Sequence, residues 1–263
     1  GQNFLIDSNI VDNIAKNACD INCKTIEIGP GLGALSEMLL KYSKCVDAYE
    51  IDKDMYAILK QSIDDSKFNV YLEDFLDTDL TKYEGETIFF SLQIIQNLVQ
   101  NQYISKYEGD TIRVCSNLPY YVTTPILFKL FNSNLDISKI TVMVQKEVGD
   151  RFKARVGSED YNALSIIVQY LYDVKQEMNV SKAVFYPSPK VDSVVISFTP
   201  KFKRNFEYEK GLFEFIENCF KNRRKTLNNN LKQFLDVDTI GRIYSTLNLK
   251  VSVRAQELDL DTF

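Results

Sequence analysis

Residues 24–33 contain a short apolar strand, predicted over 24–29, that runs into three glycines at alternate positions: Gly29, Gly31 and Gly33. Residues 33–42 then carry apolar side chains at helical spacing. A strand that runs through glycines into a helix lets a ligand approach the backbone at the helix N-terminus. This unit favours an α/β fold, in which ligands bind in a crevice at the carboxyl ends of the strands.

The alternation of strand and helix continues through the first two hundred residues. It predicts a doubly wound, mainly parallel sheet with helices on both faces. A late strand over 190–199 is consistent with an antiparallel edge. The further predicted strands are 45–50, 68–72, 111–116 and 139–145, and the further helices are 52–64, which Asp52 caps, and one that Thr123 or Thr124 caps, with Pro125 near its first turn.

The composition shifts at Pro200, and the rest of the chain has helical spacing over 211–222, 223–235, 238–248 and near Ala255. We therefore expect two domains, an α/β domain over 1–199 and a small all-helical domain over 200–263.

A near-repeat interrupts the first domain. Residues 82–88 recur as residues 106–112 at an offset of 24, which indicates a tandem duplication and an insert of about 82–110. Inserts of this kind lie on surface connections. A tolerated insertion without function and a partner-binding element both remain open.

The chain of 263 residues contains no histidine. This excludes Ser-His-Asp and Cys-His catalysis, histidine-ligated zinc and histidine general bases. The five cysteines are scattered, which argues against a disulfide framework and for a reducing compartment, and we expect no metal site. No segment has the 18 or more apolar residues of a membrane span.

The net charge of −5 excludes a uniformly basic nucleic-acid binder but not a local basic patch. Residues 200–232 carry nine basic and four acidic side chains, so the charge is polarised along the chain.

Acidic residues follow the next two strands. Glu50 ends the second strand, 21 residues after Gly29, a spacing that suits a carboxylate on ribose hydroxyls. Asp74 closes the third strand, where its carboxylate can accept a hydrogen bond from an adenine amino group. Together with the glycine loop, these acids predict a nucleoside cofactor. No phosphate-binding Lys-Ser/Thr pattern follows the glycines, which argues against a nucleoside triphosphate.

Asn117-Leu118-Pro119-Tyr120 follows the fourth strand and is the most specific motif. Pro119 stiffens the turn and restricts Leu118 to extended geometry. The Asn117 carboxamide oxygen and a backbone carbonyl can then converge on one amino group, and Tyr120 offers a ring on which a base can stack.

The ordered set Gln2-Asn3-Phe4-Leu5, Glu27 with the glycine loop, Glu50, Asp74 and Asn117–Tyr120 resembles the rRNA adenine N6-dimethyltransferases. The resemblance implies a Rossmann-like domain that uses S-adenosylmethionine (SAM), followed by a small helical domain. Residues 117–125, 184–193 and 223–227 are similar to the KsgA branch, which modifies two adjacent adenosines near the 3′ end of small-subunit rRNA. The gap from Asp74 to Asn117 is longer than in that family, and removing 24 residues restores its spacing.

The resemblance also implies roles for individual residues. Asn117 and the Leu118 carbonyl would bind the target N6, with Pro119 shaping the turn, while Tyr120 and Phe185 would sandwich the target base. Glu50 would hold the ribose, Ile51 would pack on the cofactor adenine and Asp74 would bind its amino group. The remaining cofactor-site residues implied are Gln2, Asn3, Leu5, Glu27, Gly29, Gly31, Gly33 and Phe75.

Basic side chains supply a candidate RNA surface. Lys221, Arg223, Arg224 and Lys225 are predicted to start a helix suited to phosphate and 2′-hydroxyl contacts, and Arg151 and Lys153 to extend the track from the other domain. A solvated helix face is the alternative.

We therefore expect SAM-dependent N6,N6-dimethylation of adenosines in small-subunit rRNA, by a monomer without membrane contact. An Erm-like methyltransferase of large-subunit rRNA, or a noncatalytic ribosome-assembly or transcription factor on the same fold, are the alternatives. We expect the protein in the cytoplasm, although a chain from an organelle would have much the same sequence.

Overall fold

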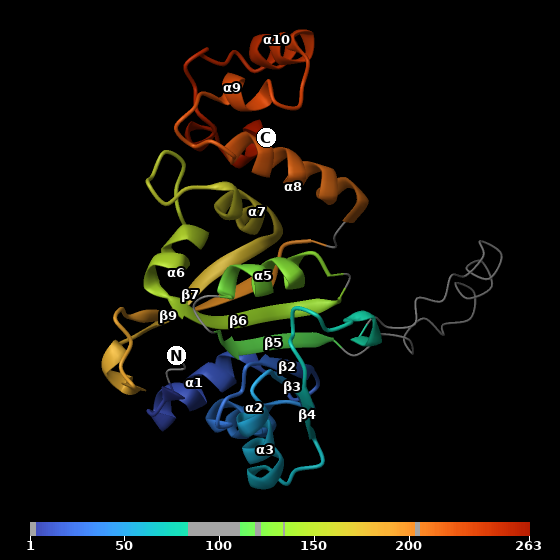
Figure 1. The fold of residues 1–263 in the computed structure, drawn as a ribbon, viewed down its shortest axis with the longest axis vertical. Helices are drawn as coiled ribbons and strands as arrows, with labels where there is room; N and C mark the ends of the chain where they lie inside the picture. The colour runs from blue at the N-terminus through green and yellow to red at the C-terminus, as the bar shows by residue number, and fades with distance from the viewer. Residues whose placement is uncertain (1–3, 84–110, 119–121, 134, 203–205) are drawn as a thin grey trace, which may run out of the picture. The chain divides into compact units, whose positions relative to one another are not determined.

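The computed structural model describes residues 4–83, 111–118, 122–133, 135–202 and 206–263. Seven strands form one sheet in the order β4-β3-β2-β5-β6-β9-β7 (Figure 1). They are β2 (Lys24–Ile28), β3 (Cys45–Glu50), β4 (Phe68–Leu72), β5 (Ile112–Asn117), β6 (Ile137–Gln145), β7 (Tyr172–Val180) and β9 (Ser193–Pro200).

The sheet is parallel in its first five strands. β2 pairs in parallel with β3 and with β5, β3 pairs with β4, and β5 pairs with β6. This confirms the predicted doubly wound α/β fold. The late strand β9 is not an edge, because it lies between β6 and β7. The edge is β7, whose alternating burial marks a half-exposed strand that sequence analysis missed.

Helices cover both faces of the sheet (Figure 1). α1 (Ser8–Ala18), α2 (Ala34–Tyr42) and α3 (Lys53–Ser62) lie on one side and α5 (Thr123–Phe131) on the other. Asp52 caps α3 as expected, since its side chain accepts the N–H groups of Asp54 and Met55. The expected threonine cap of α5 is wrong, because Val122 is the cap residue and Thr123 is already helical.

The core of this part forms where α1 and α2 pack on the sheet. Ala15, Leu39, Val46 and Cys115 are fully buried there, together with the strand residue Val195. Four of the five cysteines are buried, as small apolar side chains commonly are. A separate two-stranded sheet pairs β1 (Phe4–Leu5) antiparallel with β8 (Phe185–Tyr186), which follows the short helix η3 (Lys182–Val184).

The chain divides into two compact units. Unit 1 comprises residues 1–145 and 176–197, and unit 2 comprises residues 146–175 and 198–263. One boundary therefore lies within two residues of the expected division at 199/200. Residues 146–175, which we expected in the α/β domain, group with the C-terminal segment. That these units are the two domains stays a prediction.

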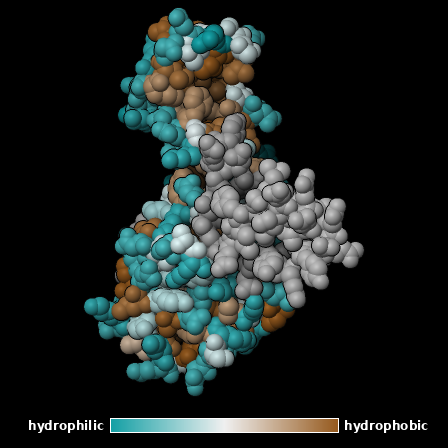
Figure 2. All heavy atoms as spheres, turned by 90° about the vertical axis from the view of Figure 1, so that its right-hand side faces the viewer, coloured by the Kyte–Doolittle hydropathy of each residue, from teal (hydrophilic) through white to brown (hydrophobic). Residues whose placement is uncertain are grey.

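Unit 2 is mostly helical. Its core is formed by Cys219, Leu227, Leu231 and Ile240, and rings of Phe220 and Phe263 pack beside them. Figure 2 shows apolar residues gathered on one face of this unit. A small unit buries a smaller fraction of its apolar surface than a large one does. Its helices are α6 (Lys146–Phe152), α7 (Ala163–Leu171), α8 (Phe206–Phe220), α9 (Leu227–Leu231) and α10 (Val237–Thr246), with short η4 (Ala255–Glu257) and η5 (Leu260–Thr262).

Candidate active site

Four strands of the sheet end at one edge with the predicted functional residues. Because β2, β3, β4 and β5 are parallel, the glycine loop, Glu50, Asp74 and Asn117 emerge on the same side. Backbone hydrogen bonds extend the pairing past the strands, from Gly29 N–H to the Tyr49 carbonyl (2.9 Å) and from Glu73 N–H to the Glu50 carbonyl (3.0 Å). The structure therefore brings these predicted residues together.

The glycine loop requires its glycines. Gly31 and Gly33 have φ of +59° and +87°, a backbone conformation that side chains with a Cβ rarely adopt. A Cβ on Gly33 would lie 2.9 Å from Leu59 Cδ2. α2 begins directly after Gly33 without a side-chain cap, so its N-terminus is open to an anionic group.

Glu50 is buried and already held in place. Its Oε2 accepts the N–H of Gly31 (3.0 Å) and its Oε1 accepts the N–H of Asp52 (2.9 Å). Each carboxylate oxygen retains a further lone pair. Glu50 therefore fixes the glycine loop and can at the same time accept hydrogen bonds from a pair of hydroxyls.

Glu27 lies one strand away and is 1% exposed. Its Oε2 accepts the Ser36 hydroxyl at 2.6 Å, which ties strand β2 to the first turn of α2. Burial raises the pKa of Glu27 to about 8, and the Glu50 carboxylate adds to the rise. Glu27 is thus largely protonated at neutral pH, and its hydrogen bond with Ser36 holds β2 to α2 beside the glycine loop.

Asp74 forms a compact turn after β4. Its Oδ1 accepts the N–H of Leu76 (2.9 Å), and its second oxygen can accept from a ligand. Phe75 is buried with its ring edge-on to Tyr49. Ile51 is 61% exposed, which suits the expected packing on a flat ring.

Asn117 ends β5 and is half-buried. Ser116 beside it donates a hydrogen bond to the carbonyl of Ile28, directly before the glycine loop. Leu118 is buried, and its N–H donates to the Met143 carbonyl (3.3 Å), which fixes the direction of the next peptide. Pro119 and Tyr120 lie outside the described residues.

The N-terminal strand lies over the glycine loop. A Cβ on Gly31 would be 3.3 Å from the Phe4 ring, and Leu5 packs against the core beside Phe185. Of the cofactor-site residues that the resemblance implies in this segment, Leu5 is described, whereas Gln2 and Asn3 lie outside the described residues. Pairing of β1 with β8 brings residues 4 and 186 together across 182 positions of sequence.

Phe185 does not present its ring to solvent. It is 4% exposed and belongs to the core cluster, whereas its neighbour Tyr186 is 73% exposed. A base could stack on Phe185 only if the ring became uncovered. Its expected role in the base sandwich therefore stays a prediction.

The basic segment of unit 2 is a turn, so the expected helix start at 223 is wrong. The helix α9 begins at Leu227, because the Thr226 hydroxyl caps it. Asn230, which is 1% exposed, donates from Nδ2 to the carbonyls of Cys219 (2.7 Å) and Asn222 (3.3 Å) and so holds the turn from inside.

Within this turn the basic side chains differ. Arg223 is half-buried and donates to the Ser158 carbonyl (3.1 Å), while Lys221, Arg224 and Lys225 are exposed. Arg151 and Lys153 belong to the same unit as this turn, and their expected part in an RNA surface stays a prediction. Arg151 also forms an ion pair with Glu147 at 3.8 Å.

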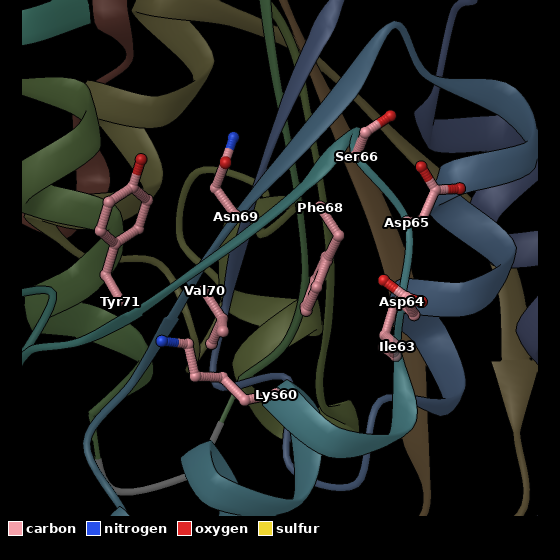
Figure 3. Close-up of a pocket in the computed structure, with 9 residues that line it drawn as sticks. All are labelled: Lys60, Ile63, Asp64, Asp65, Ser66, Phe68, Asn69, Val70 and Tyr71. Atoms are coloured by element: carbon pink, nitrogen blue, oxygen red, sulfur yellow. The ribbon is translucent and has the colours of Figure 1, made fainter.

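Other kinds of site are not found in the described part of the chain. It contains no cluster of metal-ligating side chains and no helix long and apolar enough to cross a membrane. An open hollow lies beside the edge strand β4 and the end of α3 (Figure 3), but none of the predicted site residues lines it.

Sequence reasoning missed two serines that orient the site. Ser36 and Ser116 are both fully buried; Ser36 donates to Glu27, and Ser116, the residue before Asn117, donates to the Ile28 carbonyl. Their only signal is a polar side chain at an otherwise apolar position, since buried hydroxyls need partners.

The whole chain is similar to proteins that act on ribosomal RNA. The family model described as ribosomal RNA adenine dimethylase matches residues 1–261. A protein named ribosomal RNA small subunit methyltransferase A from Mycoplasma mobile is 37% identical, over 100% of this chain and 93% of its own length. The protein of that name from Bacillus cytotoxicus is 40% identical, over 100% of this chain and 87% of its own length.

Solved structures agree. A dimethyladenosine transferase from Plasmodium falciparum has a TM-score of 0.73 at 25% identity, covering 98% of this chain and 94% of its own. The 23S rRNA methyltransferase ErmE has a TM-score of 0.68 at 17% identity, covering 98% and 96%, and shares the fold.

Proposed function

Because the chain belongs to the ribosomal RNA adenine dimethylase family, we propose that its substrate is small-subunit rRNA, in which it dimethylates two adjacent adenosines at N6 near the 3′ end. It is an rRNA methyltransferase and uses SAM as methyl donor. The curated relatives named above are all small-subunit enzymes, which supports this substrate over large-subunit rRNA. The likeness to ErmE, at 17% identity, supports the fold and not the substrate.

The residues present fit SAM. The glycine loop has no Cβ to obstruct a ligand, and the N-terminus of α2 can face a carboxylate. Glu50, held by two backbone N–H groups, would accept hydrogen bonds from the ribose hydroxyls. Asp74 would accept one from the adenine amino group, and Ile51 would cover the adenine ring.

When bound, SAM supplies a methyl group on a sulfonium, so this chain needs no nucleophile of its own. The task of the protein is to prepare the adenosine N6, whose lone pair is delocalised into the ring. The Asn117 Oδ1 and the Leu118 carbonyl would each accept a hydrogen bond from one of the two N6–H groups. This arrangement favours a tetrahedral nitrogen and frees the lone pair. The rest is alignment, which rigid strand ends provide.

No residue of matched pKa is required as a base, because the proton can leave after transfer. This agrees with a chain without histidine. Tyr120 and Phe185 would hold the target base between two rings, and a second transfer follows if the pocket accepts monomethyladenosine.

The turn at residues 221–225 would contact the phosphates of folded RNA. Lys221, Arg224 and Lys225 are exposed on a turn that Asn230 holds from inside, so little order has to be gained on binding. Arg223 would contribute mainly by fixing the turn, and Arg151 and Lys153 would extend the surface. A ribosomal substrate places the protein where subunits assemble, and we propose a cytoplasmic monomer.

The observation that carries this function is that Glu50, Asp74 and Asn117 lie at the same edge of the sheet, where their parallel strands end. Two variants test the separate roles proposed for Glu50 and Asn117. Glu50→Gln should weaken binding of S-adenosylhomocysteine (SAH) strongly, whereas Asn117→Ala should leave SAH affinity within a few-fold and abolish transfer. A large loss of SAH binding in Asn117→Ala would refute the role assigned to that residue.

A further inference from the structure

Lys129 lies near the end of α5, the helix that follows the Asn117–Leu118 strand end. Its side chain contacts a segment about fifty positions away in sequence. Nζ donates hydrogen bonds to the carbonyls of Leu76 (2.7 Å) and Thr78 (2.6 Å) and lies 5.5 Å from the centroid of the Phe75 ring. These three partners lie one to four residues after Asp74.

The segment that Lys129 contacts is a single turn built on Asp74. The Asp74 carbonyl accepts the N–H groups of Asp77 (3.0 Å) and Thr78 (3.1 Å), and its Oδ1 accepts that of Leu76. The last carbonyls of such a turn have no partner within it and need an external donor. Lys129 supplies two charge-assisted hydrogen bonds to them.

The surroundings make this contact strong. Lys129 is half-buried, and burial lowers the pKa of its ammonium while the carboxylates of Asp77, Glu73, Asp74 and Asp79 oppose that shift. The ammonium has therefore exchanged water for fixed carbonyls and acidic neighbours, in which setting a hydrogen bond contributes more than at an exposed site.

We propose that Lys129 is a positioning residue for the cofactor, which fixes the Asp74 turn and couples it to the helix behind the target-binding motif. The inference rests on the proposed role of Asp74 toward the adenine of SAM. Without the ammonium, the turn would lose these two hydrogen bonds to α5, and Asp74 would sample other orientations.

The test is SAH binding by isothermal titration calorimetry. Lys129→Met keeps the aliphatic stem over Phe75 and removes the donors, and we expect about tenfold weaker binding. At saturating SAM, kcat on small subunits should change by less than about threefold, so the loss appears in KM for SAM. Lys60→Met, which removes an exposed lysine from α3, is the matched control and should bind as wild type does.

A double-mutant cycle separates positioning from a general loss of stability. If Lys129 acts through the turn, Lys129→Met should cost less than about twofold in an Asp74→Ala background. An equal loss in both backgrounds, or wild-type affinity in Lys129→Met, would overturn the inference. Lys129→Gln replaces the methionine variant under the same criteria if that variant does not fold.

The same data distinguish this inference from the function on which it rests. A wild-type chain that binds no SAH contradicts the proposed function itself. Wild-type affinity in Asp74→Ala alone would remove the role of Asp74 and the role of Lys129 with it.

Discussion

The hydroxyl of Ser116 donates a hydrogen bond to the carbonyl of Ile28, across the pair of strands β5 and β2. Ile28 directly precedes the glycine loop, and Ser116 directly precedes Asn117. One buried hydroxyl thus joins the residue before the cofactor loop to the residue before the target-binding motif. In the proposed mechanism, this hydrogen bond would help to hold the cofactor loop and the target-binding motif at a fixed separation.

Ser116→Ala should therefore lower kcat by about tenfold, because the alignment of Asn117 is lost. SAH affinity should stay within about twofold, because the glycine loop keeps its conformation. Stability should fall by about 1 kcal/mol, as for one buried hydrogen bond. Ser43→Ala removes a buried hydroxyl contact with Thr25 at the opposite end of β2 and should cost similar stability without a change in kcat. Equal kcat losses in both variants would contradict the account.

Glu27→Gln tests whether the buried Glu27 carboxyl is neutral. Burial raises the pKa of Glu27 from 4.5 to about 8 in the folded chain. The folded state therefore binds this proton more tightly than the unfolded state, and the resulting stability is present below about pH 4.5 and lost as pH rises to about 8. The neutral glutamine has no such dependence, so the variant should gain in melting temperature relative to wild type between pH 5 and pH 9. Parallel pH profiles of the two proteins would be inconsistent with a buried neutral Glu27.

Phe185 and Tyr186 can be distinguished by paired variants. If the base sandwich uses Phe185, Phe185→Leu should lower kcat at least tenfold, since a base–aromatic contact is worth roughly 1–3 kcal/mol. Tyr186→Leu, which changes the exposed neighbour, should have little effect. The reverse order, measured by single-turnover methylation, would transfer the stacking role to Tyr186.

The basic turn predicts a separation of RNA affinity from cofactor affinity. Arg224→Glu with Lys225→Glu should weaken binding to small subunits and flatten its salt dependence, because phosphate contacts release counterions. SAH binding should not change. Lys250→Glu, an exposed charge reversal in the same unit, is the control. Arg223→Glu should instead lower the melting temperature, since its guanidinium holds the Ser158 carbonyl.

The insert should be removable. The Tyr83 hydroxyl donates to Asp47 Oδ2 (2.8 Å), and Lys24 Nζ lies 5.3 Å from the Tyr83 ring. Lys24 also pairs in register with Ile112, so both ends of the insert meet at one residue.

Excision of residues 82–105 places the second Lys-Tyr pair where Lys82 and Tyr83 stand, with four residues left to reach Ile112. Because surface connections tolerate such changes, transfer activity should stay within about twofold. Adding Tyr107→Ala to the excision should lower the melting temperature, as that ring would then fill the place of Tyr83. Loss of folding in the simple excision would show that the insert packs into the body.

The α/β fold and the common edge could be predicted because parallel pairing leaves few choices. Once residues 24–29 are a strand that runs into glycines, the acids after the next strands must reach the same edge. The strand β7 could not be predicted, since its alternating polar side chains at an exposed edge resemble a loop. The grouping of residues 146–175 with the C-terminal segment depends on long-range contacts that no local pattern encodes.

Local patterns did not give the surroundings of several candidate side chains. The run Arg223–Lys225 has helical composition, but the capping hydroxyl of Thr226 and the buried Asn230 make it a turn. The burial of Phe185 follows from its pairing with Leu5, and the role of Lys129 from carbonyls fifty positions away. Such partners are invisible until the chain is folded.

The most direct test of the central claim is methyl transfer from labelled SAM to small ribosomal subunits that lack the dimethyladenosines, with large subunits and free DNA in parallel. The account predicts label as N6,N6-dimethyladenosine in the small subunit alone. Label in the large subunit or in DNA, or no transfer by a chain that binds SAH, would contradict it.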